Sequence, residues 1–382
     1  MDYKIPFNKP FIVGKELYYV AQSVLQQQIS GDGPYTKKVQ QLLQEKFGAA
    51  QILLTNSCTA ALELAAILSG IGEGDEVILP SFTFSSTANA FLLRGARLVF
   101  IDCRPDTMNI DESLVANAIT DLTRIIVPVH YAGIACEMDS ILDLAQKHRI
   151  LVVEDAAQGV NAKYKGRFLG TLGDIGAYSF HETKNFICGE GGAIVLNKRE
   201  FTERAEIVRE KGTNRSRFFR GQVDKYSWVD IGSSFLMSDI LAAFLFAQIE
   251  NMDLITARRR RTHEHYASML RPLEVRGLLS LPAVPPGCEP NYHIFFVILN
   301  SLSERSRLIE HLKANGILAV FHYVPLHTSQ MGQSMGYREG MLPVTERLSE
   351  RLLRLPVYYE MGEEEVTFVS NAILEFFKLP PS

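Results

Sequence analysis

Cysteine is scarce in this sequence of 382 residues, and its positions form no pattern. The five cysteines are odd in number and widely scattered, with no Cys-x-x-Cys pair and no metal-ligand spacing. This excludes a disulfide framework and a cysteine-based zinc site, and it predicts reduced thiols in a cytoplasm. We therefore expect no bound metal. The cysteines are Cys58, Cys103, Cys136, Cys188 and Cys288.

The sequence also lacks an excess of either charge. Its 39 basic and 43 acidic residues give a formal net charge of -4, which provides no general attraction to nucleic acid or to an anionic membrane. The run Arg258 to Arg261 resembles a nucleic-acid patch, but consecutive arginines on a helix cover all its sides and favour a solvated or interface role. We expect neither nucleic acid nor a membrane as a partner.

Long apolar runs are missing as well. No stretch reaches the roughly 18 apolar residues that a membrane span requires. The first residues, "MDYKIPFNKPFIVG", carry charge and proline where a signal peptide needs an apolar core. With 47% hydrophobic and 21% charged residues, the composition predicts a soluble cytoplasmic protein with a large core.

Between about residues 50 and 200, short β-branched runs alternate with helix-like stretches, which indicates a mostly parallel sheet flanked by helices. The near-continuous apolarity of the runs predicts burial on both faces. Residues 111–119 and 138–148 have helical spacing and read as crossover helices. We predict an α/β fold whose strands are QILLT, DEVILP, ARLVFID, RIIVPVH, ILVVED, GAYSF and AIVLN.

The pattern changes after about residue 250. A helix-like stretch over 254–270 leads to proline-rich sequence, and then to a predicted strand at 291–299, a helix at 304–316 and a strand at 318–324. This order is typical of a smaller α+β unit. We therefore predict a large domain with an N-terminal arm over residues 1–250 and a small domain over residues 251–382.

A short polar turn opens the helix after the first predicted strand. Ser57, Cys58 and Thr59 precede apolar residues at helical spacing. Unpaired amides at a helix start, with hydroxyl groups beside them, form a ready phosphate site. Ordinary N-capping explains the same residues and is the more common reason for them.

Asp155 is the last residue of the predicted strand "ILVVED" and therefore lies at its carboxyl end, where open α/β sheets place their ligands. A buried carboxylate without a partner would cost several kcal/mol, so a cationic group or a ligand nitrogen is expected near it. A helix N-cap is the simpler alternative.

Lys184 follows the strand "GAYSF" of the same predicted sheet, in a loop that glycines border. Ser179 and His181 flank this strand end. Most loop lysines are merely solvated, and buried reactive ones are exceptions. The polar turn at residues 57–59, the carboxylate of Asp155 and Lys184 itself are all expected at one edge of the sheet. A reactive role for Lys184 is therefore the better interpretation.

A phosphate cradle, a carboxylate and a lysine are what pyridoxal 5'-phosphate needs. The lysine amine bonds the aldehyde, and the aspartate keeps the pyridine nitrogen protonated. Phe84 is a candidate to stack on the ring, although a core position is the safer interpretation for any one aromatic. Gln158, one helical turn after Asp155, is placed to bond the phenolic oxygen.

From about residue 5 to the end, the sequence resembles the nucleotide-sugar aminotransferases of the DegT/DnrJ/EryC1/StrS family. The motifs that carry this resemblance are NSCTAAL, VVEDAAQG, GAYSFHETKN, GEGGAIVLN, HYVPLH and RLLRLPVYY. Longer phrases are similar to members that make dTDP-4-amino-4,6-dideoxygalactose. These phrases are GDGPYTKKVQ, RPDTMNIDESL, VHYAGIACEMD, SFHETKN and EKGTNRSRFFRGQVDKY.

The resemblance implies a fold-type-I pyridoxal phosphate aminotransferase that is a homodimer with active sites at the subunit interface. L-glutamate would be the amino donor, and a dTDP-4-keto-6-deoxy sugar the acceptor. The amine would be placed on C4, and the product would serve the synthesis of surface polysaccharide, either enterobacterial common antigen or the O-antigen of lipopolysaccharide.

The resemblance also implies roles for single residues by motif position. Lys184 matches the Schiff-base lysine, Asp155 the partner of the pyridine nitrogen, and Gln158 the group on the ring oxygen. Phe84 matches the stacking aromatic. The implied phosphate contacts are Ser57, Cys58, Thr59 and Ser179.

The chain departs from the family pattern in two places. Many relatives have glycine where this chain has Cys58, which must offer its amide without the freedom of glycine. Many also have an asparagine that reaches the partner's phosphate, and here Ser234 is a shorter substitute. Dehydratases of the family carry histidine in place of the lysine, so Lys184 favours transamination.

Two segments offer groups for the diphosphate and the hexose. "KGTNR" supplies cation and amide donors in a glycine turn. "HYVPLH" supplies two histidines and a tyrosine, and the histidines match no zinc spacing. The candidate substrate-binding residues are Lys211, Asn214, Arg215, His322, Tyr323 and His327.

Several alternatives stay open. The protein could act on another keto sugar, give the gluco epimer, or be a pyridoxal phosphate sugar dehydratase. A regulatory member without catalytic activity is a different class. A dinucleotide enzyme is disfavoured because "GIGEG", residues 70–74, lacks the G-x-G-x-x-G spacing and precedes a strand, and neither a G-x-S-x-G elbow nor a P-loop is present.

Overall fold

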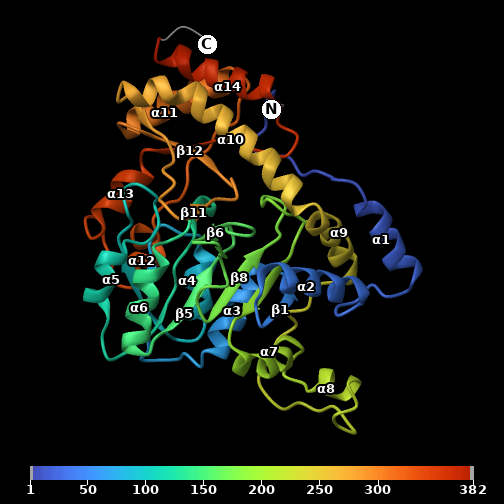
Figure 1. Ribbon diagram of the computed structural model, residues 1–382. Coiled ribbons are helices and arrows are strands. Elements are labelled where there is room, and N and C mark those ends of the chain that lie inside the picture. The colour runs from blue at the N-terminus through green and yellow to red at the C-terminus, as the bar shows by residue number, and fades with distance from the viewer. Residues whose placement is uncertain (1–2, 379–382) are drawn as a thin grey trace.

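A seven-stranded sheet forms the centre of the computed structural model, which describes residues 3–378 (Figure 1). Its strand order is β1-β9-β8-β5-β4-β2-β3. The five strands from β8 to β3 pair in parallel, whereas β9 is antiparallel to both β1 and β8. The predicted α/β fold with a mostly parallel sheet is confirmed. The strands are β1 (Gln51–Thr55), β2 (Glu76–Pro80), β3 (Arg97–Ile101), β4 (Thr123–Ile126), β5 (Leu151–Asp155), β8 (Ile175–Ser179) and β9 (Gly192–Leu196).

Helices cover both faces of this sheet because its strands are apolar on both faces. In β1, Ile52 and Leu54 pack into one hydrophobic cluster and Leu53 packs into the other, as the alternation of side chains along a strand requires. The first cluster includes residues from α2 (Pro34–Phe47), α6 (Met138–His148) and α9 (Asp239–Glu250). The second includes residues from α3 (Cys58–Leu68), α4 (Ser85–Leu92) and α7 (Thr202–Arg209).

A second layer of structure lies beyond one end of the large sheet, at the top of Figure 1. An antiparallel sheet of order β10-β12-β13 packs with helices α10, α11 and α14 around its own hydrophobic cluster. This is the α+β arrangement that the sequence predicts. The elements are α10 (Met252–Val275), β10 (Leu279–Ser280), β12 (Phe295–Leu299), α11 (Leu302–Ala314), β13 (Leu352–Leu355) and α14 (Glu363–Phe376).

The predicted domain boundary at 250/251 falls at the break between α9 and α10. Ile5 of the N-terminal arm packs into the cluster of the second layer. The division into two domains stays a prediction, and residues 1–2 and 379–382 of its ranges lie outside the described residues. Within the described chain, no single helix is long and apolar enough to cross a membrane, although α9 and α10, bent by 65°, satisfy the length and composition together.

Shorter elements complete the described chain. Strand β11 pairs with β6, and β6 pairs with β7, so the segment before β12 joins a small three-stranded sheet of its own. Helix α8 lies on a segment that projects from the bottom of the molecule in Figure 1. These elements are α1 (Glu16–Leu25), α5 (Glu112–Ala118), β6 (Lys163–Tyr164), β7 (Arg167–Phe168), α8 (Arg215–Phe219), β11 (Cys288–Glu289), α12 (Gln330–Ser334) and α13 (Pro343–Ser349).

The predicted strand at 318–324 is wrong. Only Val320 pairs with Arg354 of β13, as an isolated bridge. The chain then leaves the sheet edge because His322 and Tyr323 both turn toward Tyr131, whose ring centroid lies 5.7 and 6.3 Å from theirs. A regular strand would send these two neighbours to opposite faces.

Candidate active site

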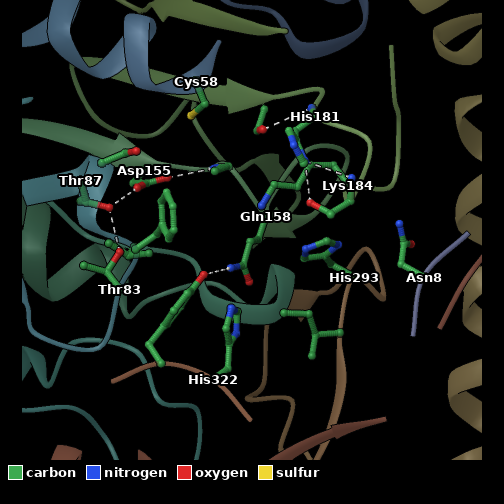
Figure 2. Close-up of a pocket in the computed structure, with 18 of the residues that line it drawn as sticks. Asn8, Cys58, Thr83, Thr87, Asp155, Gln158, His181, Lys184, His293 and His322 are labelled. Carbon is green, nitrogen blue, oxygen red and sulfur yellow. Dashed lines mark hydrogen bonds between the residues drawn. The ribbon is translucent and has the colours of Figure 1, made fainter. Parts of the chain in front are cut away.

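A cavity of about 730 Å³ lies between the large sheet and the second layer (Figure 2). The ends of β5 and β8, the start of α3 and the start of α4 form one wall. Strand β13 and residues 320–323 form the opposite wall. Ligands of α/β folds bind at the carboxyl ends of parallel strands, which is where the sequence places its candidate residues.

Lys184 lines this cavity from a compact loop after β8. Backbone bonds from Phe180 N to Gly191 O (2.8 Å) and from Glu182 N to Gly189 O (2.9 Å) close the loop on itself. Burial lowers the pKa of the Lys184 amine below its usual value. Among residues 3–378, none accepts a hydrogen bond from this amine, so it is free for a ligand.

Asp155 ends β5 and is 6% exposed. Its Oδ2 accepts a hydrogen bond of 2.6 Å from Thr87 Oγ1, and Thr87 in turn bonds Thr83 at 2.8 Å. Figure 2 shows this chain of hydroxyl groups beside the carboxylate. Oδ1 accepts from the backbone N–H of Ala157 at 3.1 Å, so the expected local capping bond exists as well. The carboxylate is held rigidly and still faces the cavity.

Hydroxyl groups gather at the start of α3. Ser57 caps the helix by accepting from Ala60 N at 3.0 Å, as the capping interpretation expects. Thr59 Oγ1 lies 2.8 Å from Ser86 Oγ at the start of α4, and Ser179 ends β8 at the same place. Two helix starts and three further hydroxyl-bearing side chains are a suitable environment for a phosphate group.

Gln158 and Phe84 also lie at the cavity. The Gln158 Oε1 accepts from Ala132 N at 2.7 Å, and its Nε2 donates to the hydroxyl of Tyr323 at 3.1 Å. Phe84 is 60% exposed and lines the cavity, so the alternative of a core position is wrong. Its ring is available to stack on a planar ligand.

The model of the DegT/DnrJ/EryC1/StrS aminotransferase family matches residues 11–374 of the chain. The chain belongs to this family. The match spans both layers of the structure and includes both walls of the cavity.

Relatives agree with this membership along nearly the whole length. GDP-perosamine synthase of Escherichia coli O157:H7 is 31% identical, over 98% of each chain. A pleiotropic regulatory protein of Geobacillus stearothermophilus is 34% identical, over 91% of this chain and 90% of its own. The structure of Spr1654 from Streptococcus pneumoniae in its PLP-form superposes with a TM-score of 0.91 at 27% identity, over 98% of each chain, and that protein is also known in a PMP-form.

Two of the expected substrate residues reach the cavity of this family member. The rings of His322 and Tyr323 lie against each other, and His322 Nδ1 is 3.2 Å from the hydroxyl of Tyr131. Burial, with the charges of Arg354 and Lys184, lowers the pKa of His322 to about 2. The imidazole is therefore neutral at physiological pH, and His322 and Tyr323 present polar but uncharged groups to the cavity.

The structure does not bring the other expected residues to the cavity. His327 is fully buried, and its two ring nitrogens bond Ser81 (2.7 Å) and Glu346 (2.7 Å), so neither nitrogen is free for a substrate. Ser234 is paired with Glu210 as an isolated bridge. The remaining three lie on or next to the projecting segment that carries α8, namely Lys211, Asn214 and Arg215.

The sequence analysis missed several cavity residues. Ser86 and Thr87 follow Phe84 at the start of α4. This helix comes after the carboxyl end of β2, and a segment after a strand end is where α/β sheets bind ligands, so its position could have marked both residues. His293 positions the lysine loop, because its Nδ1 lies 2.8 Å from Asn185 Oδ1. No local signal marks Arg354, whose neighbours in sequence read as an ordinary strand.

Basic groups outnumber acidic ones around this cavity, which favours anionic ligands. No cluster of three or more metal-ligating side chains is found within residues 3–378. The ionisable side chains that line the cavity are Asp155, His181, Lys184, Glu190, Arg259, His293, His322, Tyr323, Arg354 and Cys58.

Proposed function

We propose that the protein transfers the amino group of L-glutamate to C4 of a dTDP-4-keto-6-deoxyhexose, giving dTDP-4-amino-4,6-dideoxygalactose for surface polysaccharide. At a coarser level it is a sugar aminotransferase of its family, and its cofactor is pyridoxal 5'-phosphate. The observation that carries the aminotransferase chemistry of this proposal is the partly buried, unbonded amine of Lys184 in one cavity with the fixed carboxylate of Asp155. The choice of sugar and donor rests on the sequence resemblance.

The cavity residues fit this cofactor by their chemistry. When bound, pyridoxal phosphate supplies an electron sink for charge that develops on the amino acid's α-carbon. The hydroxyl groups of Thr59 and Ser179, with the amide of Cys58, would hold its phosphate. Asp155 would hold the proton of the pyridine nitrogen, and Phe84 would cover the ring, since all of these residues line the cavity. Gln158 keeps a second amide proton for the phenolic oxygen.

Lys184 serves both as the covalent anchor and as the acid–base group. Because burial lowers its pKa, a larger fraction of the amine is neutral and able to accept the proton of the donor's α-carbon. In the second half-reaction, the Lys184 amine delivers a proton to C4 of the sugar, the carbon that receives the amino group. Thr87 and Thr83 keep the Asp155 carboxylate fixed through both half-reactions.

A homodimer completes the site in this proposal. The segment that carries Lys211, Asn214 and Arg215 projects from the body and exposes large aromatic side chains, among them Phe219 (69% exposed) and Trp228 (79% exposed). Exposed apolar side chains of this size favour burial against a partner. The projecting residues and Ser234 would then serve the partner's cavity.

The test combines purified holoenzyme with glutamate and dTDP-4-keto-6-deoxyglucose, followed by NMR of the product. We expect an amine on C4 in the galacto configuration. The gluco epimer, or no reaction with this sugar but turnover of another, would move the assignment to that product; the relative named as a GDP-perosamine synthase makes GDP-linked keto sugars the next to try.

A protein that binds no cofactor would instead support the regulatory class, which the name of one relative represents. Loss of water from the sugar without amine transfer would identify a dehydratase. The Lys184→Ala variant, measured in parallel, shows whether any turnover depends on the lysine.

A further inference from the structure

Arg354 is a fixed but unpaired cation in the cavity wall. Its backbone lies in β13, where its N–H donates to Val320 O at 2.8 Å and where it pairs with Phe296 of β12. Its side chain lines the cavity, and the ring of Phe7 lies 4.6 Å from the guanidinium carbon. Strand and ring therefore fix the position of the guanidinium before any ligand arrives.

The guanidinium has no carboxylate partner in the described chain. The buried Nε of Arg354 has no hydrogen-bond partner, and no acidic side chain of residues 3–378 lies within ion-pair distance of the group. Arg259, the other arginine at this cavity, differs because three backbone carbonyls accept its hydrogen bonds. The side chain of Arg354 is only partly buried, and its guanidinium faces the cavity without an acidic partner, so an anion that enters the cavity can pair with it.

The aromatic side chains around Arg354 carry no charge that would compete for this anion. The groups near Arg354 are Tyr131, Tyr323 and His322, which are neutral at physiological pH because burial raises the pKa of the two phenols and lowers that of the imidazole. The hydroxyl groups at the start of α3 belong to the opposite wall. An anion at Arg354 is thus separate from the phosphate group expected at that helix.

We propose that Arg354 binds a carboxylate of the amino donor. The planar fork of an arginine matches a carboxylate with two parallel hydrogen bonds, and it orients the bound acid as well as attracting it. This inference rests on the proposed function, because it assigns a binding group for the donor of that reaction.

A nucleotide diphosphate is the other anion that this cavity would receive. The amine of Lys184 must reach the donor's α-carbon, and a carboxylate is bonded directly to that carbon. In a nucleotide sugar, the hexose ring separates the diphosphate from the reacting C4. Arg354 and Lys184 line one cavity and are close enough for their charges to interact, which favours the donor.

The test measures binding of glutarate, an unreactive dicarboxylate, and of dTDP to the holoenzyme by calorimetry. In Arg354→Gln we expect glutarate affinity to fall about 10- to 100-fold, the range for a lost charge-assisted pair, and dTDP affinity to stay within about twofold. Arg354→Lys keeps the charge without the fork and should give an intermediate loss. Arg307→Gln, an exposed arginine over Phe376, is the matched control.

Unchanged glutarate affinity in Arg354→Gln would overturn the inference, as would a loss of dTDP affinity equal to or larger than the loss for glutarate. The cofactor absorbance of each variant shows that the cavity is intact. A wild-type protein that binds cofactor and glutarate but aminates no keto sugar would disprove the proposed function alone, so the two failures are distinguishable.

Discussion

The two walls of the cavity hold their polar groups in different ways. On the wall of the large sheet, Asp155 is bonded by Thr87 and Ala157, and Thr59 is bonded by Ser86. On the wall of the second layer, Arg354 has no carboxylate partner, and the ring of His322 shares one hydrogen bond, with Tyr131, at 3.2 Å. Groups that hold a resident cofactor can stay hydrogen-bonded to their neighbours, whereas a group without a partner, such as the guanidinium of Arg354, is open to a ligand that enters and leaves.

A similar contrast exists within β5, between neighbouring carboxylates. Glu154 is fully buried, and it accepts hydrogen bonds from the backbone N–H groups of Gly170, Leu172 and Gly173 and contacts His130. Asp155 points the other way, to the cavity. Alternation along the strand therefore directs Glu154 into the protein interior and Asp155 to the cavity.

The largest effect is expected on the wall of the large sheet, from Lys184→Ala. Loss of both the covalent anchor and the acid–base group should lower kcat by about 10³-fold or more, with the fold unchanged. Steady-state rates and the cofactor's absorbance band measure this. Turnover at the wild-type rate would refute the assignment of the lysine.

The pair Asp155→Asn and Glu154→Gln separates chemistry from structure in β5. We expect Asp155→Asn to lower kcat by about 10²-fold or more, because the ring nitrogen loses its charged partner. In Glu154→Gln, an amide replaces an acceptor that faces three N–H groups, so stability should fall by about 3 kcal/mol. Measured by urea unfolding and by steady-state rates, Asp155→Asn should lower kcat more than stability, and Glu154→Gln should lower stability more than kcat. The same balance of effects in both variants would contradict the distinction.

A smaller effect is expected from Thr87→Val, which removes the hydroxyl group at nearly constant volume. The Asp155 Oδ2 loses its 2.6 Å bond, and activity should fall about tenfold. Thr83→Val, one bond farther from the carboxylate, should lower kcat less. A larger loss for Thr83 than for Thr87 would contradict this order.

The smallest effect concerns the stability of the cofactor-free protein and its pH dependence. Because burial lowers the pKa of Lys184 below 10.5, the unfolded chain binds more protons than the folded chain between the two pKa values. The contribution of Lys184 to stability should therefore rise with pH up to about 10.5, and Lys184→Met should be the more stable protein at neutral pH.

Urea unfolding across this pH range should show the difference between Lys184→Met and wild type shrinking as pH rises. Exposed Lys147→Met is the control and should show no such trend. A difference that stays constant with pH would show that burial does not shift the titration of Lys184.

The sequence predicts the positions of Asp155 and Lys184 because each is marked by a local pattern of residues. Each follows a short apolar run, and the carboxyl ends of neighbouring parallel strands meet at one edge. Phe84 shows the limit of such reasoning, since its aromatic ring suits a core as well as a cavity. Only the packing of α4 exposes it.

His322 and His327 show a second limit. They stand five positions apart in one motif, yet one lines the cavity and the other is buried between Ser81 and Glu346. The chain turns at Pro325, and the contacts on each side of the turn come from distant segments. No spacing rule contains that information.

The sequence by itself determined the α/β class, the strands of the large sheet and the residues at their ends, because periodicity and strand ends are local properties. Only the tertiary structure decided which side chains face one another across the cavity. Arg354 lies far from Lys184 in sequence, and β13 reads as an ordinary strand. The role proposed for Arg354 depends on the cavity that it faces and on the absence of a carboxylate near it within the described chain. Both arise only when the two layers pack together.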